Sequence, residues 1–356
     1  MKIETYRLDL PFHKKFVISH STREVSESVI VKVSLDNGIY GYGECLPRKY
    51  VTGETQESVL KTLRDSLIPK VEKWKIKNYS DLINKLRKIE VNKNQNCALC
   101  ALELALLDSY GKHFKKSVEQ IFSGPYLDKI YYSGVISGGD GFFKKLLKIK
   151  LFGFKSVKIK VGMDNDLRNL KTARKILGNK VDIRVDANCA WGVSETLGKV
   201  GEFKKLNISA IEQPVKTIEE INKVAAKSKI PIIADESLCN LDDAKKLKNV
   251  IFDIRISKCG GLLKSLEIYN YAKKKGITCM LGCHVGESGI LTAAGRHFAL
   301  GVRDLKYLEG SYNHFLLKED ITKEDLTFGR KGAARRIEGY GLGIRVDKEL
   351  IKRHIQ

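Results

Sequence analysis

From residue 130 onward the sequence has a period of about twenty-five residues, and this period constrains the fold most strongly. Short β-rich runs alternate there with amphipathic helical stretches such as NLKTARKIL and EEINKVAAK. Eight strand candidates separated by helix-length segments are typical of a parallel β/α array, and eight strands close a barrel. The alternative, a doubly wound sheet, lacks a GxGxxG motif after an early strand. The eight runs are IYYSGVI (130–136), SVKIK (156–160), VDIRVD (181–186), ISAIE (208–212), PIIAD (231–235), FDIRISK (252–258), GITCMLG (276–282) and DLKYLE (304–309).

The first 125 residues do not follow this period. The segment VSESVIVKVSLDNGIYGYGE predicts a β-hairpin that turns at Asn37 and Gly38. Helical patterns follow at 55–72, 79–90 and 95–115. We therefore expect an α+β unit before the barrel, and a tail after about residue 320 that is too short to form a domain of its own.

Charged residues stand at the ends of five successive strand candidates, at spacings of 26, 26, 23 and 23 residues. Any one of them could simply mark where polar residues begin. The carboxyl ends of barrel strands, however, open into one mouth, where such folds hold their chemistry. Charges packed together must be paired or bound to a metal. We therefore predict that these five side chains form a site: Lys160, Asp186, Glu212, Asp235 and Lys258.

The types of these residues indicate a reaction. Asp186, Glu212 and Asp235 would offer oxygen ligands to a hard cation, for which Mg²⁺ is the default and Mn²⁺ remains open. Lys160 and Lys258 follow strands that are four apart, and therefore lie on opposite sides of an eight-stranded barrel. Two opposed amines can remove a proton from one face of a carbon and return it to the other.

Lys158 lies two residues before Lys160, so both side chains share one face of the strand. The charge of Lys158 would favour the neutral, basic form of its neighbour. A metal ion would bind the substrate carboxylate and stabilise the enediolate that forms on deprotonation. The pattern thus predicts metal-assisted proton abstraction next to a carboxylate.

The net positive charge of the chain suggests an alternative functional class, a basic nucleic-acid-binding protein. The chain holds 64 Lys and Arg against 42 Asp and Glu, a net charge of +22. Its lysines are spread over many helical stretches without interleaved aromatics, so we expect no nucleic-acid partner. No apolar run has the length of a signal peptide or membrane helix, which predicts a cytoplasmic enzyme with no membrane partner. Cys97 and Cys100 form a CxxC inside an apolar helical pattern and are interpreted as core residues.

Five ordered motifs resemble the enolase superfamily, specifically its muconate lactonizing enzyme subgroup: VKIKVG (157–162), DANCAW (186–191), IEQP (211–214), ADES (234–237) and SKCGG (257–261). The resemblance implies an α/β fold: an α+β capping domain (1–125), a modified TIM barrel, (β/α)₇β, that carries the catalytic residues (126–320), and a tail (321–356) that packs back on the capping domain. It also implies Mg²⁺ ligands at Asp186, Glu212 and Asp235, an acid/base pair at Lys160 and Lys258 supported by Lys158, and orienting roles for Asn188 and Glu236.

Within the subgroup, FVISHSTREVSESVIVKV (16–33) and KYVTGET (49–55) are similar to the capping loops of dipeptide epimerases. This similarity implies that Arg23 binds a substrate carboxylate. We also expect substrate contacts from Tyr50, Tyr307 and Glu309, and from Glu287 in the loop GCHVGESGI, where the family more often has a Cys-Met-x-Glu-Ser form. His284 of the same loop is expected to be a structural or a substrate-contacting residue. Tyr307-Leu308-Glu309 stands where those enzymes carry Asp-x-Asp. The leading hypothesis is a Mg²⁺-dependent, homo-oligomeric dipeptide epimerase with L-Ala-D/L-Glu as first candidate substrate. N-acylamino acid racemisation, o-succinylbenzoate synthesis and muconate cycloisomerisation remain alternatives.

Overall fold

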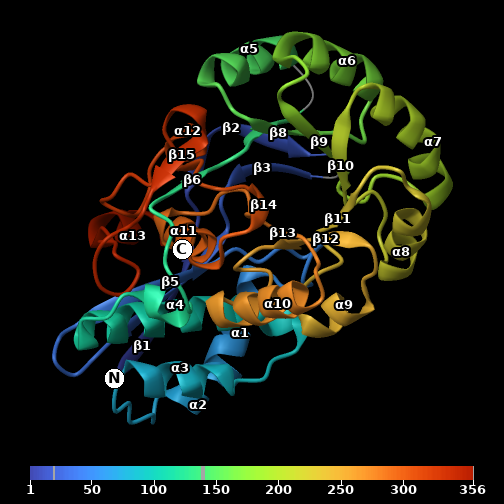
Figure 1. The fold of residues 1–356 in the computed structure, drawn as a ribbon. Helices are drawn as coiled ribbons and strands as arrows, with labels where there is room; N and C mark the ends of the chain where they lie inside the picture. Colours follow the sequence, from blue (N-terminus) through green and yellow to red (C-terminus); the bar gives the residue numbers. More distant parts are fainter. Residues whose placement is uncertain (19–20, 138–140, 356) are drawn as a thin grey trace.

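The computed structural model describes residues 1–18, 21–137 and 141–355 (Figure 1). Its larger part is an arc of green to orange helices around a set of strands. The teal helices and most of the blue N-terminal elements lie beside this arc, whereas the blue strands β2 and β3 lie within it in this view, and the red C-terminal segment runs along the left edge.

Eight parallel strands form the barrel, and each pairs with its neighbours in chain order. The first and last strands are joined where the N–H of Ser133 donates to the carbonyl of Leu308 at 2.8 Å. The strands are β7 (Gly134–Ile136), β8 (Ser156–Lys160), β9 (Asp182–Asp186), β10 (Ile208–Glu212), β11 (Ile232–Ala234), β12 (Val250–Ile254), β13 (Cys279–Leu281) and β14 (Leu305–Leu308).

One helix follows each of the first seven strands, which confirms the predicted (β/α)₇β fold class. In the fourth of these helices, Thr217 and Glu220 form a capping box, and Ile221 and Val224 face the core. The helices are α5 (Phe142–Phe152), α6 (Asp166–Leu177), α7 (Val193–Lys205), α8 (Ile218–Lys227), α9 (Leu241–Lys246), α10 (Leu262–Lys274) and α11 (Gly289–Val302).

The N-terminal part is α+β, as predicted. Strands β1 (Lys2–Leu8), β4 (Ser28–Ser34) and β5 (Tyr40–Cys45) form an antiparallel sheet, and β2 (Pro11–Ile18) pairs with β3 (Ser21–Val25). The predicted hairpin turn is confirmed, with Gly38 at φ +82°. The helical elements are α1 (Gln56–Thr62), η1 (Leu63–Leu67), α2 (Ile68–Val71), α3 (Tyr79–Arg87), η2 (Lys93–Gln95), α4 (Asn96–Phe114) and η3 (Val118–Ile121).

Helix α4 is almost entirely buried and packs closely on β5. The close approach of the α4 backbone to β5 requires glycine at position 43, because a Cβ on Gly43 would lie 2.0 Å from the carbonyl oxygen of Ala101. Cys97 and Cys100 are buried in α4 as free thiols, and burial raises the pKa of each well above its usual value. The core interpretation of this CxxC is therefore confirmed.

The C-terminal segment returns to the N-terminal part. Its elements are α12 (Asn313–Leu316), η4 (Arg330–Gly332), β15 (Ala333–Arg335), which pairs with β6 (Lys129–Tyr131), and α13 (Lys348–His354). Ile355 forms an isolated bridge with Leu8, and Gly341 accepts a hydrogen bond from the N–H of Val118 at 3.0 Å. The division at residues 125 and 320 stays a prediction.

Candidate active site

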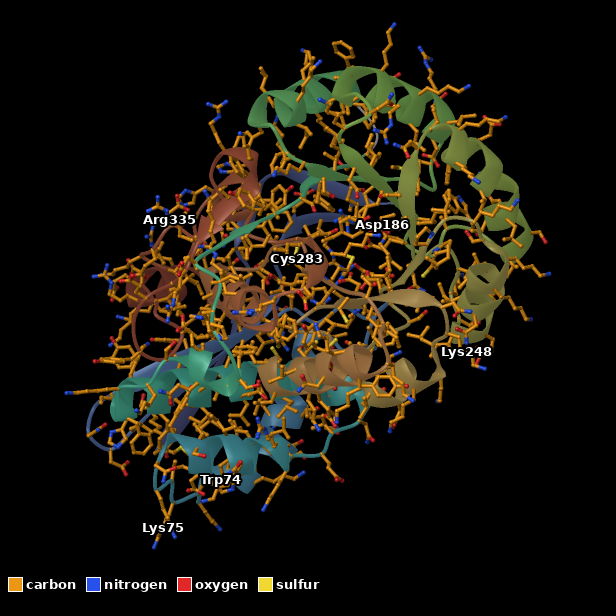
Figure 2. All side chains as sticks on the ribbon, in the orientation of Figure 1. Trp74, Lys75, Asp186, Lys248, Cys283 and Arg335 are labelled. Carbon is orange, nitrogen blue, oxygen red and sulfur yellow. The ribbon has the colours of Figure 1, made fainter. Side chains whose placement is uncertain are left out.

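The structure brings all five predicted strand-end charges to the carboxyl end of the barrel. Each lies at or shortly after the last residue of its strand, and each is buried. In Figure 2, the labelled Asp186 lies inside the arc of helices, with Cys283 of the β13 loop near the centre. Parallel strands in register place these ends at one mouth, which is why spacing along the chain predicted proximity.

One side of the mouth is organised by the two lysines of β8. Lys160 Nζ lies 2.6 Å from Asp186 Oδ2 and 2.7 Å from Asn188 Oδ1. Lys158 Nζ lies 3.0 Å from Glu212 Oε1, 3.2 Å from Asp186 Oδ2 and 2.6 Å from Glu309 Oε2. Lys158 is thus surrounded by three carboxylates, which raise its pKa well above the usual value although burial opposes them.

The opposite side is organised by Lys258 and by Arg255, which the sequence analysis did not single out. Lys258 Nζ donates to Asp235 Oδ1 at 2.8 Å, and to the backbone carbonyls of Asp235 at 2.6 Å and Asp253 at 2.8 Å. The guanidinium of Arg255 contacts Asp235 directly, and lies 3.5 Å from Asp253 and 3.9 Å from Glu212. Lys258 is fully buried, whereas Lys160 and Arg255 line the cavity described below.

Three buried carboxylates are arranged as a metal site would require. Glu212, Asp235 and Asp253 each offer an oxygen, and these oxygens lie within 4.8 Å of one another. Two buried oxygens, Glu212 Oε2 and Asp253 Oδ1, have no hydrogen-bond partner among the described residues. An all-oxygen set with such orphaned atoms fits a hard divalent cation. This cluster contains Asp253, whereas the ligand set predicted from the sequence contained Asp186 in its place. The role of Asp186 as a metal ligand stays a prediction.

The carboxyl groups of the cluster have pKa values shifted in opposite directions. Burial raises the pKa of Glu212 well above its usual value, and the charge of Asp186 raises it further. Burial acts on Asp235 in the same direction, but Arg255 and Lys258 outweigh it and lower the pKa of that carboxyl. The pKa of Asp186 is lowered in the same way, because Lys160 and Lys158 outweigh its burial. Asp186 and Asp235 are therefore ionised, whereas at Glu212 the charge of Lys158 does not outweigh burial and Asp186, and a divalent cation would supply further positive charge.

A cavity of about 320 Å³ opens beside these groups. Its inner wall is polar and includes Lys158, Lys160 and Arg255, and its outer wall is largely apolar. The outer wall includes Phe16, Tyr50, Val135, Ile136, Val285, Phe315, Leu316 and Leu317, with Lys145 from the first turn of α5 among them. This size and this combination of walls suit a small molecule with a charged end and an apolar end.

Four of the six predicted substrate contacts line this cavity: Tyr50, His284, Glu287 and Glu309. Glu309 is already paired with Lys158 and with Arg184. Arg23 does not line the cavity; it forms an ion pair with Glu27 and lies 6.0 Å from the centroid of the Tyr50 ring. Substrate contacts through these residues stay predictions.

Tyr307 is placed away from the cavity, which differs from the prediction. Its ring lies in the barrel interior, and its hydroxyl is 3.2 Å from Asp182 Oδ2 and 3.1 Å from Ser209 Oγ. Asp182 is the first residue of β9, so the hydroxyl points toward the amino ends of the strands. A side chain in this position supports the barrel core.

The two predicted orienting residues lie beside the lysines and carboxylates. The backbone N–H of Asn188 donates to Asp186 Oδ1 at 3.0 Å, and its side-chain amide donates to Glu236 Oε1 at 3.1 Å. Asn188 adopts φ +43°, a left-handed turn directly after β9 that brings its amide back over the strand end. Burial raises the pKa of Glu236 to about 7, helped by the charge of Asp235.

Three charged residues of the site, Arg184, Asp253 and Arg255, were not predicted from the sequence. A period of two could have identified Arg184, because it lies two residues before Asp186 and residues at this spacing share one face of a strand. The same period counted back from Lys258 does not reach Asp253 or Arg255, which lie five and three residues before it.

The chain thus combines a (β/α)₇β barrel with lysines on opposite sides of its mouth and a buried acidic cluster between them. Residues 144–350 match the family model described as enolase C-terminal domain-like. Residues 2–122 match the mandelate racemase / muconate lactonizing enzyme N-terminal domain. The chain belongs to this mandelate racemase / muconate lactonizing enzyme family of the enolase superfamily.

Known relatives are racemases and epimerases, which makes the chain an isomerase. It is 30% identical to N-succinyl-L-Arg/Lys racemase of Bacillus cereus over 325 residues, 86% of this chain and 85% of the relative. The substrate-liganded L-Ala-D/L-Glu epimerase of Bacillus subtilis superposes with a TM-score of 0.84 at 26% identity, covering 97% and 98% of the two chains. A dipeptide epimerase of Enterococcus faecalis, in complex with Mg and L-Leu-L-Tyr, gives 0.82 at 25%, covering 96% and 98%.

Within residues 1–18, 21–137 and 141–355, no helix has both the length and the apolar character needed to cross a membrane.

Proposed function

We propose that this chain is a Mg²⁺-dependent epimerase that inverts the Cα of the C-terminal residue of a dipeptide, with L-Ala-D/L-Glu as first candidate substrate. The observation that carries the proposal is the placement of Lys160 and Lys258 after strands four apart, on either side of a buried carboxylate cluster. A cytoplasmic location and a homo-oligomeric state belong to the proposal as well.

The two lysines exchange protons with opposite faces of one carbon. Neutral Lys160 takes the Cα proton of one epimer, and the Lys258 ammonium gives a proton to the other face. Lys160 is then protonated and Lys258 neutral, so the reverse reaction starts from the other epimer. Lys158 keeps its positive charge at the substrate carboxylate throughout. When bound by Glu212, Asp235 and a third carboxylate, Mg²⁺ would stabilise the negative charge that develops on the substrate.

Lys258 must give up one contact before it can act. Its ammonium has three donors, and all three are used by Asp235 and Asp253. The contact with Asp235 Oδ1 is the one that metal ligation by the same carboxylate would weaken. We therefore expect Lys258 to depend on the bound cation for its reactivity, more than Lys160 does.

Racemisation of an N-acylated amino acid with no free ammonium is the second candidate. Glu309, the residue expected to bind a dipeptide's ammonium, already pairs with two cations, Lys158 and Arg184. An N-succinyl group would not need a carboxylate partner. The similarity to N-succinyl-L-Arg/Lys racemase of Bacillus cereus supports the same candidate.

The test is exchange of the Cα proton in D₂O. Dipeptides and N-succinyl amino acids are incubated with the enzyme and Mg²⁺, and deuterium uptake is read by mass spectrometry. We expect uptake with at least one compound. Lys160→Ala and Lys258→Ala should each abolish epimerisation while exchange persists from a single epimer. Lys246→Ala, exposed on α9, is the matched control. Epimerisation by both active-site variants would refute the two-lysine proposal.

A further inference from the structure

The loop that follows β13 carries a histidine whose ring is left unsatisfied. His284 is 3% exposed and lines the cavity. Its backbone N–H donates to Glu287 Oε1 at 2.7 Å. Neither ring nitrogen has a hydrogen-bond partner among the described residues. Buried polar atoms are almost always paired, so an unpaired imidazole on a cavity wall indicates a group supplied by the ligand.

Positive charges outweigh the one nearby carboxylate, Asp235, in their effect on the imidazole. Burial lowers the pKa of His284 well below its usual value, and the nearby guanidinium groups of Arg255 and Arg48 lower it further. The ring is therefore neutral, with one N–H donor and one acceptor nitrogen. A neutral N–H donor suits an uncharged oxygen acceptor. A substrate carboxylate would bind more strongly to the cationic lysines and to Arg255.

The other polar groups on this part of the wall are already committed. Glu309 pairs with Lys158 and Arg184, and Arg255 contacts Asp235. Glu287 accepts from the backbone of His284, and burial raises the pKa of its carboxyl to about 8. Val285, which follows His284 in the chain, and Tyr50 contribute apolar surface to the same cavity. A neutral carbonyl attached to an apolar chain fits this wall.

We propose that His284 donates a hydrogen bond from a ring nitrogen to the amide carbonyl oxygen of the substrate, and thereby selects amino acids that carry an acyl group on nitrogen. This inference rests on the proposed function, since a dipeptide and an N-succinyl amino acid share that amide. His284 acts here as a positioning and specificity residue, because it holds the acyl group while Lys160 and Lys258 exchange the proton.

The test compares oxygen with sulfur at the acceptor position. L-Ala-L-Glu and N-succinyl-L-arginine are each offered with their thioamide counterparts, in which a weaker acceptor replaces the carbonyl oxygen. Cα exchange in D₂O is measured for the Mg²⁺-loaded wild type, His284→Phe and His284→Gln. The phenylalanine variant removes the donor at similar size, and the glutamine variant keeps an N–H.

We expect His284→Phe to lose about tenfold in kcat/KM on the amide probe that the wild type accepts. The wild type should prefer amide over thioamide about fivefold more strongly than His284→Phe does, and His284→Gln should recover most of that preference. If the phenylalanine variant does not fold, a folded His284→Ala variant replaces it. Loss of the preference for amide over thioamide in that variant supports the inference. An equal preference in wild type and variant overturns the inference alone. Absence of exchange by the wild type with every probe overturns the proposed function and this inference together.

Discussion

His297 on α11 makes the stability of this protein depend on pH. The residue is buried, and its Nε2 lies 3.1 Å from the carbonyl oxygen of Leu342 in the C-terminal segment. Burial lowers the pKa of His297 from 6.5 to about 4, although the contact with Leu342 partly opposes the shift. The unfolded chain therefore takes up a proton near pH 6.5, and the folded chain does so only near pH 4.

The sign follows from this difference. A histidine with a lowered pKa contributes stability that is present above pH 6.5 and is lost as the pH falls toward 4. Between pH 7.5 and 4.5 the loss attributable to His297 is about 2.5 kcal/mol, because each pH unit in the window contributes up to about 1.4 kcal/mol. His297→Gln cannot be protonated, so its free energy of unfolding lacks this component.

Urea unfolding of wild type and His297→Gln at several pH values measures the effect. The difference between the two free energies of unfolding should shrink by about 2.5 kcal/mol from pH 7.5 to pH 4.5. Leu300→Ala, a buried substitution on the same helix, serves as control, since its cost should not change with pH. A pH-independent difference for His297→Gln would refute the reasoning.

Three further predictions concern the site and its support. Arg255→Met should tighten Mn²⁺ binding about tenfold in an EPR titration, because the guanidinium contacts the same carboxylates as a divalent cation; unchanged affinity would contradict this. Gly43→Ala should lower the free energy of unfolding by about 2 kcal/mol or more, whereas Gly201→Ala, with open space in α7, should not; equal effects would argue against the close packing of α4. Chelation with EDTA should abolish Cα exchange and added Mg²⁺ should restore it; exchange in EDTA would exclude a metal-dependent reaction.

The barrel and the position of its site could be predicted because both depend on periodicity. A strand that ends in a charge every twenty-five residues or so places that charge at one mouth, regardless of details of packing. For this reason the five predicted side chains lie close together at the mouth of the barrel: Lys160, Asp186, Glu212, Asp235 and Lys258. Pattern along the chain determines which end of the barrel a residue occupies.

The pairing of these charges could not be predicted, because it depends on distances between side chains from different strands. Arg255 and Asp253 enter the acidic cluster through contacts with β10 and β11 that no local motif encodes. Arg184 reaches Glu309 from β9, so the carboxylate that the family resemblance assigned to the substrate is already paired with a cation. Tyr307 shows the same limit, since only its hydrogen bonds with Asp182 and Ser209 reveal which way the ring points.

The charge balance of the mouth connects the cofactor with the choice of substrate. Five cationic side chains, Lys158, Lys160, Arg184, Arg255 and Lys258, contact five carboxylates, Asp186, Glu212, Asp235, Asp253 and Glu309. Such a cluster is stable in a buried place only while positive and negative charges remain matched. A divalent cation adds two positive charges, and a substrate carboxylate returns one negative charge. Because one of the two reacting lysines starts the reaction neutral, a single substrate carboxylate completes the balance, so the cation and the substrate carboxylate should bind to this site cooperatively.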